Sequence, residues 1–381
     1  MTGDAAVRGI RDHDREGTIG LFAAEPHAPY ARPPLSKGLW TGTSEDSVWR
    51  GTADLGADVH VGLRIASLDV SGKRATDDAG EEHEFERVLL ATGGTARRLP
   101  GAPDEVIAFR TVDDYRRLRA SVSEGTRVAV VGGGFIGSEI AAAVRTAGAE
   151  VKILFPEQGI GARLFPESLS AFVSDYYRER GVEVLPGELV SSVERVGDGF
   201  GLTTEGGRTL EADVVVAGLG IVPATDLAES AGLPVDDGIL VDERGRAEGF
   251  DDVYAAGDVA RFPVRALGGT RRVEHEDHAN THGRVVGANM AGADAPYDHL
   301  PFFYSDLFDL GYEAVGDVDA RLETVEEWAD PLRKGVVAYV DGDSRPRGFL
   351  LWDTWDKVDD ARELIRSGEP LAAGALRELL G

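Results

Sequence analysis

The sequence contains no cysteine, so the chain itself can form no disulfide, no thiolate metal site, no cysteine-ligated iron–sulfur cluster and no catalytic thiol. No apolar run approaches the ~20 residues that a membrane span requires. The N-terminal stretch also lacks the basic-then-apolar order of a secretory signal. We therefore expect a cytoplasmic protein without a membrane span.

Basic residues are scarce as well. The chain has 40 Lys and Arg against 67 Asp and Glu, which gives a formal net charge of −27. This balance argues against nucleic acid and anionic membranes as partners, because both must be met by positive charge. An acidic surface poor in lysine fits a high-salt cytoplasm, and a codon bias toward G and C explains it equally well. Lysine occurs only at positions 37, 73, 152, 334 and 357.

A length of 381 residues predicts two or three domains rather than one core. The strongest local pattern is a βαβ unit at 127–157. A β-branched strand at 127–131 is followed by glycines in G-x-G-x-x-G spacing, a helix at 138–147 and a second strand at 151–155. Such glycines allow the close backbone approach that a dinucleotide pyrophosphate needs, although a glycine-rich turn without a ligand is the alternative.

Weaker patterns surround this unit. We expect a helix at 4–14, strands at 18–23, 59–70, 84–91, 212–220 and 252–260, and a helix at 279–290. After Pro301 the pattern changes to antiparallel strands at 324–328, 335–339 and 348–352 and a helix at 357–367, which indicates a separate α+β domain.

Three acidic or basic signals accompany the strands and loops. Glu157 lies just past the second strand of the βαβ unit, where a carboxylate binds ribose hydroxyls and repels a 2′-phosphate, so we predict NADH over NADPH. Asp258 ends a short strand and can accept a hydrogen bond from a ribityl hydroxyl, although a plain strand-to-turn aspartate is the alternative. The loop PYARPPLSKGLW at 29–40 holds Arg32 and Lys37 between prolines, and taken alone it indicates a rigid surface loop with solvated charges.

Three histidines, at 275, 278 and 282, have a spacing that could place them on one helical face. A metal site is conceivable there. The neighbouring Glu276 and Asp277 fit better as first-turn acids of a helix, so we predict no metal. The N–H groups at the start of this helix could instead point at an anionic ring.

Taken together, these segments resemble the family of apoptosis-inducing factor and the bacterial NADH-dependent ferredoxin and rubredoxin reductases. The resemblance covers nearly the whole chain. The motifs that carry it are PYARPPLSKGLW, VVGGGFIGSEIAAAV, LFPEQGIGARLFPESLS, VYAAGDVA, RRVEHEDHA and FFYSDLFDLGYEAVG.

The resemblance implies an α/β fold with two Rossmann-like domains, one for FAD and one for NADH, and a C-terminal α+β domain. The implied bounds are 1–104 and 229–300 for the FAD domain, 105–228 for the NADH domain and 301–381 for the C-terminal domain. The family also has a first strand and glycine turn before the opening helix. That strand is missing from the FAD domain here, and we expect a mis-assigned start codon to be the reason.

Site residues are implied by position. Family members often have Trp at the Tyr304 position and Asn at that of Asp353, and the second difference leaves that contact in doubt. The implied FAD-binding residues are Glu25, Arg32, Lys37, Ile65, Ala91, Thr92, Gly93, Arg110, Gly257, Asp258, Glu274 and His275. The implied NADH-binding residues are Gly132, Gly133, Gly134, Phe135, Ile136, Gly137, Glu139, Glu157, Arg163, Gly220, Tyr304 and Glu313.

The resemblance further implies that NADH gives a hydride to FAD, with Lys37 and Glu139 as catalytic residues. We predict that Lys37 and Glu139 form an ion pair. An iron–sulfur protein, a quinone or oxygen would then accept the electrons, and a homodimer is an open prediction. The alternative is a truncated, non-catalytic relative that binds NADH or a partner protein and holds FAD poorly.

Overall fold

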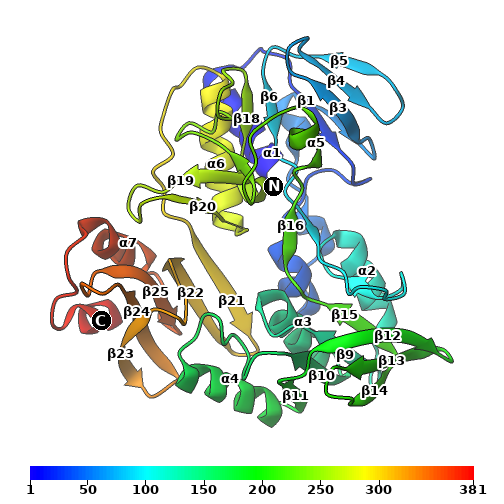
Figure 1. The fold of residues 1–381 in the computed structure, drawn as a ribbon, viewed down its shortest axis with the longest axis vertical. Helices are drawn as coiled ribbons and strands as arrows, with labels where there is room; N and C mark the ends of the chain where they lie inside the picture. The colour runs from blue at the N-terminus through cyan, green and yellow to red at the C-terminus, as the bar shows by residue number, and fades with distance from the viewer. The chain divides into compact units, whose positions relative to one another are not determined.

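The computed structural model describes all 381 residues and divides the chain into two compact units (Figure 1). Unit 1 comprises Met1–Arg32, Ser44–Thr95 and Val222–Pro301. Unit 2 comprises Pro33–Thr43, Ala96–Ile221 and Phe302–Gly381. Two paired strands, β7 (Gly94–Ala96) and β16 (Ile221–Pro223), carry the chain from one unit to the other. None of the helices is long and apolar enough to cross a membrane.

The core of unit 2 is a parallel sheet of five strands in the order β11-β10-β9-β15-β8. Strands buried on both faces need continuous apolar runs, and Val130, Ile153 and Val215 are fully buried. The βαβ unit predicted at 127–157 is thereby confirmed. The strands are β8 (Ile107–Ala108), β9 (Arg127–Val131), β10 (Glu150–Phe155), β11 (Val182–Pro186) and β15 (Val214–Ala217).

Helices and 3-10 turns complete this part of unit 2. A capping box between Thr111 and Asp114 starts α2, because each residue satisfies the other's free backbone N–H. The helix predicted at 138–147 begins three residues earlier, at Phe135, directly after Gly134. The elements are η1 (Pro33–Ser36), η2 (Gly38–Trp40), α2 (Val112–Ser121), α3 (Phe135–Thr146) and α4 (Glu167–Glu179).

An antiparallel sheet of three strands, β12 (Val190–Val196), β13 (Gly199–Thr204) and β14 (Thr209–Ala212), is inserted before β15. The strand predicted at 212–220 is confirmed as the shorter β15, and Ala212 belongs to β14 instead. The chain changes sheets at Asp213, whose carboxylate accepts the backbone N–H of Arg127 at 2.9 Å. Before this turn, β14 pairs antiparallel with β13; after it, β15 pairs parallel with β8 and β9.

The C-terminal part of unit 2 is an antiparallel sheet in the order β21-β22-β25-β24-β23, covered by α7 (Val358–Ser367) and α8 (Ala375–Leu380) (Figure 1). The predicted α+β character, the last three strands and the helix at 357–367 are confirmed. The first two strands lie in a motif that we had not assigned to any element. The strands are β21 (Phe302–Leu307), β22 (Leu310–Gly316), β23 (Glu323–Asp330), β24 (Lys334–Val340) and β25 (Pro346–Trp352).

Unit 1 is built on two closely packed helices, α1 (Thr2–His13) and α6 (Glu276–Met290). The helices approach so closely that two contact positions require glycine. A Cβ at Gly9 would lie 2.0 Å from the carbonyl oxygen of Arg284, and one at Gly287 would lie 2.1 Å from that of Ala6. Asp4 is buried in α1 and is held by the side chains of Arg8, Arg50 and Thr52. Both predicted helices are confirmed.

The strands of unit 1 form four small sheets. The strand predicted at 59–70 is interrupted by a turn at Gly62, which has a φ of +69°. The strand predicted at 252–260 is broken by η5 (Gly257–Val259), because Gly257 has a φ of +73°. Two of the sheets are two-stranded parallel pairs, β1 (Gly20–Ala23) with β2 (Asp58–Val61) and β6 (Val88–Leu90) with β18 (Val253–Ala255). The remaining sheets are β3 (Ile65–Asp69), β4 (Arg74–Asp77) and β5 (Glu82–Glu84), and β17 (Ile239–Leu240), β19 (Ala260–Pro263) and β20 (Thr270–Arg272). Short helical turns are η3 (Glu45–Val48), η4 (Thr52–Leu55) and α5 (Asp226–Ser230).

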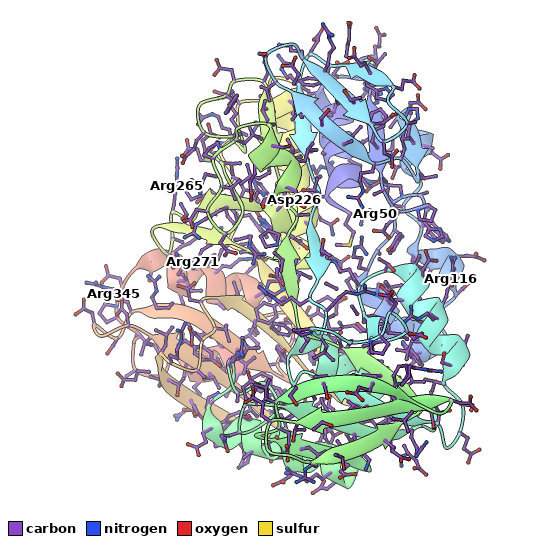
Figure 2. The ribbon with its side chains drawn as sticks, turned by 45° about the vertical axis from the view of Figure 1, so that its right-hand side comes forward. Arg50, Arg116, Asp226, Arg265, Arg271 and Arg345 are labelled. Atoms are coloured by element: carbon purple, nitrogen blue, oxygen red, sulfur yellow. The ribbon has the colours of Figure 1, made fainter.

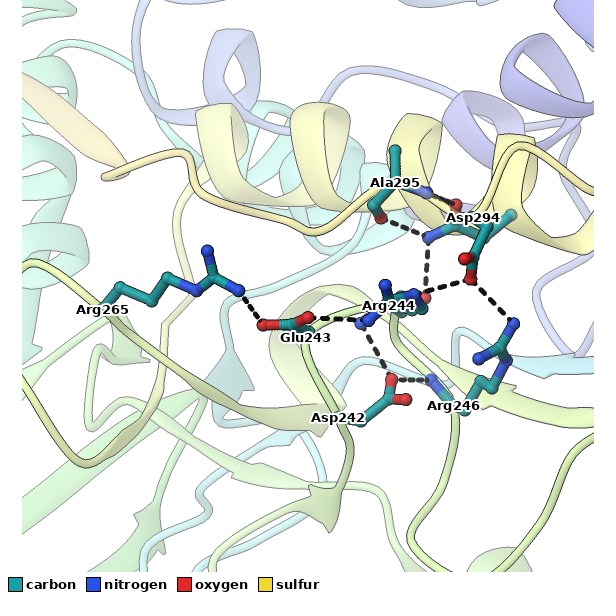
Figure 3. A network of polar contacts seen from close by, with 8 residues as sticks. Asp242, Glu243, Arg244, Arg246, Arg265, Asp294 and Ala295 are labelled. Atoms are coloured by element: carbon teal, nitrogen blue, oxygen red, sulfur yellow. Dashed lines mark hydrogen bonds and ion pairs between the residues drawn. The ribbon is translucent and has the colours of Figure 1, made fainter.

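A network of charged side chains ties the loop at 242–246 to the segment that follows α6 (Figure 3). Arg244 pairs with Asp294 through Nε at 2.6 Å and with Glu243 at 2.7 Å. Arg246 also reaches Asp294, and Arg265 pairs with Glu243. We call these residues, with Asp242, the Arg244 network.

Candidate functional site

The glycine loop of unit 2 combines tight packing with one open position. A Cβ at Gly137 would lie 1.9 Å from the carbonyl oxygen of Gly132, and one at Gly133 would lie 2.6 Å from the ring of Phe155. At Gly134 a Cβ would meet nothing within 4 Å. Gly134 is also the N-cap of α3, so no side chain caps the first N–H groups of the helix. This geometry fits a pyrophosphate at a helix N-terminus.

Glu157 lies two residues beyond the end of β10, as the sequence predicted. Its Oε1 accepts hydrogen bonds from Nε of Arg163 at 2.7 Å and from a terminal guanidinium nitrogen of Arg163 at 2.5 Å. The Arg163 side chain is 82% exposed and that of Glu157 is 23% exposed. The two residues predicted to bind the same nucleotide therefore lie together, with a carboxylate next to an exposed cation.

Tyr304 and Glu313 face each other across the pairing of β21 and β22. The Oε2 atom of Glu313 is buried and has no hydrogen-bond partner. Burial raises the pKa of the Glu313 carboxyl above its ordinary value; a hydrogen bond from the Asp356 backbone opposes this shift, and the Asp356 charge adds to it. A buried acceptor without a donor fits an amide N–H of a ligand such as nicotinamide.

The most buried charged side chain of unit 2 is the carboxylate of Glu139, in the second turn of α3. Oε1 accepts from Nζ of Lys37 at 2.6 Å and from Oγ of Ser305 at 2.6 Å, and Oε2 accepts from Oγ of Ser36 at 2.5 Å. The Glu139 side chain is 3% exposed. We call these four residues the Glu139 cluster. Its ion pair confirms the predicted contact between Lys37 and Glu139.

The loop at 29–40, taken alone, predicted solvated charges, and for Lys37 this is wrong. Its side chain is only 14% exposed. The reason lies in the two 3-10 turns, which bury Leu35, Ser36 and Leu39 and place Lys37 against α3. The ammonium also lies 5.1 Å from the centre of the Tyr304 ring, within the range of a cation–π contact.

In unit 1, Glu25 follows the carboxyl end of the parallel pair β1–β2. It accepts hydrogen bonds from Arg32 and from the hydroxyl of Tyr30. Burial alone would raise the pKa of Glu25, but the Arg32 guanidinium and these bonds hold it below its ordinary value. The position and chemistry of the carboxylate fit a ribose diol, and those of Arg32 fit a pyrophosphate.

Asp258 follows another parallel pair of unit 1, β6–β18, and is buried. The backbone turns sharply there because Gly257 is left-handed, and a Cβ at Gly257 would lie 2.2 Å from the hydroxyl of Thr2. His275 is the N-cap of α6 and makes no side-chain cap bond. Burial lowers the pKa of His275 to about 4, so its ring is neutral at physiological pH. A buried carboxylate and an uncapped helix start fit the sugar chain and ring of a flavin.

The other two histidines of α6 are structural. His278 and His282 are fully buried and lie against the ring of Phe262. Burial lowers the pKa of His278 to about 3 and that of His282 well below its ordinary value. The structure holds no group of three or more His, Asp or Glu side chains placed to bind a metal. Glu276 and Asp277 occupy the first turn of α6, as predicted.

The remaining predicted residues divide between the units. In unit 1, Ile65 begins β3, and Ala91, Thr92 and Gly93 follow β6, where the Thr92 hydroxyl donates to the carbonyl of Ala224 at 2.8 Å. Glu274 pairs with Arg272 at 2.9 Å. Unit 2 holds Arg110, Phe135, Ile136 and Gly220.

Two residues of the Glu139 cluster, Ser36 and Ser305, were absent from the prediction. Each is the direct neighbour of a predicted residue, Lys37 or Tyr304, inside a motif that we had recognised. That adjacency was the only signal in the sequence, because a buried serine is not distinguished from a solvated one by local pattern.

Comparison with known proteins places the chain in a family. Residues 2–283 match the family described as pyridine nucleotide-disulphide oxidoreductase, and residues 286–333 match the C-terminal domain of apoptosis-inducing factor. The mitochondrial apoptosis-inducing factor 1 of Dictyostelium discoideum is 35% identical over 404 residues, covering 94% of this chain and 75% of that protein. The ferredoxin–NAD(+) reductase component of the anthranilate 1,2-dioxygenase system of Burkholderia cepacia is 33% identical, covering 94% and 90%.

Among solved structures, putidaredoxin reductase in its covalent complex with putidaredoxin aligns with a TM-score of 0.91 at 27% identity, covering 98% of this chain and 93% of that one. The fold and the glycine-loop site thus define a two-nucleotide flavoprotein. The chain belongs to the pyridine nucleotide-disulphide oxidoreductase family, in the branch of apoptosis-inducing factor and the bacterial ferredoxin reductases. The predicted enzyme class, an NADH-dependent FAD oxidoreductase, and its two cofactors are confirmed.

Proposed function

We propose that this protein oxidises NADH with FAD as its cofactor and delivers electrons singly to a small iron–sulfur protein of the ferredoxin type. One NADH loses two electrons and becomes NAD⁺ with release of one proton, while two acceptor molecules each gain one electron. The names of two relatives support this acceptor class, since one is a ferredoxin reductase and the other is bound to putidaredoxin. Quinone and oxygen are the alternatives that the test below separates.

The observation that carries the proposal is the Lys37–Glu139 pair in the unit that also holds the open glycine loop. When bound, FAD supplies a ring that accepts a hydride and releases electrons one at a time. Glu25, Arg32, Asp258 and His275 would hold the cofactor, by the donor chemistry described for unit 1. Lys37 would present a fixed positive charge to an electron-rich ring, which stabilises charge as it develops.

The electrons would leave without a thiol relay, because the chain contains no cysteine. The surface on which the acceptor docks must therefore come close to the flavin itself. A negative protein overall does not favour an acidic partner, so we expect slow association at low salt and little loss of rate as salt rises.

NADH would be preferred over NADPH through Glu157. A carboxylate at the end of β10 bonds the ribose diol and repels a 2′-phosphate. Arg163 beside it moderates this preference, because its guanidinium can attract the same phosphate. We expect kcat/KM for NADH to exceed that for NADPH by about tenfold or more, and a preference for NADPH would overturn the assignment of Glu157.

The test is a visible spectrum of the purified protein followed by NADH titration without air. A yellow protein that NADH bleaches supports the enzyme, and a colourless protein that added FAD cannot restore supports a non-catalytic relative. Steady-state rates with ferredoxin, quinone and oxygen as acceptors then identify the electron acceptor. Faster turnover with quinone or oxygen than with any ferredoxin would overturn the proposed partner.

Three predictions from the sequence are retained together with this function. The cytoplasmic location, the homodimer and the domain bounds given above all stay predictions.

A further inference from the structure

The carboxylate of Glu139 has more partners than an ion pair requires. Its three donors come from η1, from the residue between η1 and η2, and from β21, which are separated from α3 by 103, 102 and 166 positions in the chain. Ser305 is fully buried and Ser36 is 5% exposed. Both hydroxyls are therefore shielded from water. The cost of burying them is offset only where their hydrogen bonds to the carboxylate have good geometry.

The two serines donate to different oxygen atoms of the Glu139 carboxylate. Ser305 shares Oε1 with Lys37, whereas Ser36 binds Oε2. Rotation of the carboxylate about its last bond would break at least one of these bonds. The orientation of Oε1 in turn fixes the ammonium of Lys37, which lies over the Tyr304 ring.

The charge of Glu139 also acts on the phenols around it. Burial raises the pKa of Tyr177 and Tyr312 well above the ordinary value, and the Glu139 charge raises both further. Both phenols therefore stay neutral. Lys37 is the only cation among the partners of Glu139, and the two serines are its neutral donors.

We propose that Ser36 and Ser305 are positioning residues that hold the Glu139 carboxylate, and through it the Lys37 ammonium, in one fixed orientation. This proposal rests on the proposed function, because it assigns the serines to the same site. Neither serine needs to touch NADH or FAD. Their loss would therefore affect how well Lys37 stabilises reduced cofactor and not how tightly NADH binds.

The chain offers a matched control. Glu188 is also held by one cation, Arg208 at 2.6 Å, and by one buried hydroxyl, that of Thr204. Replacing Thr204 with Val removes a hydroxyl-to-carboxylate bond in unit 2 that does not involve Lys37. Ser305→Ala and Ser36→Ala make the corresponding change in the Glu139 cluster, and Ser305→Thr and Ser36→Thr retain the hydroxyl.

The experiment measures three quantities for each variant: the limiting rate of flavin reduction by NADH, the NADH dissociation constant and the flavin midpoint potential. We expect Ser305→Ala and Ser36→Ala to lower the rate about tenfold and to lower the midpoint potential, with the dissociation constant within twofold of the parent. The Thr variants should recover most of the rate, and Thr204→Val should leave it unchanged. Parental rates and potentials in both Ala variants, or an equal loss in Thr204→Val, would overturn the proposal.

A second measurement does not depend on electron transfer. Urea unfolding of the flavin-free protein is compared for Ser305→Ala, Glu139→Gln and the double variant. Non-additive losses show that Ser305 acts through the Glu139 carboxylate, and additive losses overturn that link. If NADH fails to reduce the parent protein, the proposed function fails, while this cycle still decides whether the serine positions the carboxylate.

Discussion

The Glu139 cluster and the Arg244 network are both built from opposite charges, but they differ in burial and in origin. The Arg244 network contains more ion pairs, yet Asp294 is 61% exposed and Arg265 is 57% exposed. Arg265 projects outward from its loop (Figure 2). The Glu139 cluster contains a single ion pair with a side chain that is 3% exposed, completed by two buried hydroxyls.

The comparison teaches that the number of ion pairs is a poor guide to their importance. Exposed pairs are screened by salt and contribute little to stability, and those of the Arg244 network mainly order a loop near the end of α6. A buried carboxylate loses its hydration and must be fully satisfied by the protein. Of the two regions, only the Glu139 cluster holds a charged side chain in the fixed orientation that catalysis requires.

The largest expected effect is at the centre of the Glu139 cluster. Glu139→Gln keeps the shape but removes the charge that holds Lys37, so we expect the rate of flavin reduction by NADH to fall about a hundredfold. Stopped-flow absorbance without air measures it. Arg265→Ala is the control and should retain the parental rate. A Gln variant within threefold of the parent would remove the distinction between the two regions.

The glycine loop extends the same comparison to residues that serve the fold and residues that serve the ligand. Gly137→Ala would force a Cβ against the Gly132 carbonyl, so we expect a loss of about 1–3 kcal/mol in the free energy of unfolding. Gly134→Ala has open space and a φ of −84°, so stability should hold while the NADH dissociation constant rises about tenfold. Urea unfolding and NADH titration separate the two. Similar behaviour of both variants would contradict the reading of Gly134 as the ligand-facing position.

The buried histidines of α6 predict how the stability of unit 1 depends on pH. Folding lowers the pKa of His278 from 6.5 to about 3, so below pH 6.5 the unfolded chain binds more protons than the folded one. Stability is therefore complete above pH 6.5 and falls as the pH drops, by about 1.4 kcal/mol per pH unit for each histidine. Urea unfolding between pH 7.5 and 4.5 measures the slope. His282→Phe should reduce it, and an unchanged slope would show that His282 is not kept neutral by the fold.

The smallest expected effect lies in the Arg244 network. Arg265→Ala removes one exposed pair, and the free energy of unfolding should change by no more than about 0.5 kcal/mol. The same measurement in 1 M NaCl should show an even smaller difference, because salt screens exposed charges. A loss above about 2 kcal/mol would mean that the exposed network stabilises the fold as strongly as a buried cluster.

Local patterns predicted the parts of the fold that depend on neighbours in the chain. The βαβ unit, the helices α1, α6 and α7 and the last three strands were found because apolar spacing records which face of an element is buried. The patterns failed where backbone turns broke a run, as at Gly257 and Asp213. At Gly257 the backbone is left-handed, and at Asp213 the carboxylate accepts a backbone N–H. The strand before each of these residues ends although the local residues favour continuation.

For the candidate site, motif order was enough to indicate the glycine loop, Glu157 and the pairing of Lys37 with Glu139. It did not reveal Ser36 or Ser305, and by itself it described the loop at 29–40 as solvated. The burial of Lys37 depends on the packing of η1 and η2 against α3, which no local pattern contains.

The sequence alone thus determined the family, the two cofactors and the absence of any thiol from this chain, because composition and spacing are properties of the chain. Only the tertiary structure decided which groups surround Glu139. Its partners lie more than 100 residues away, and their hydrogen bonds exist because packing removes water from all of them at once.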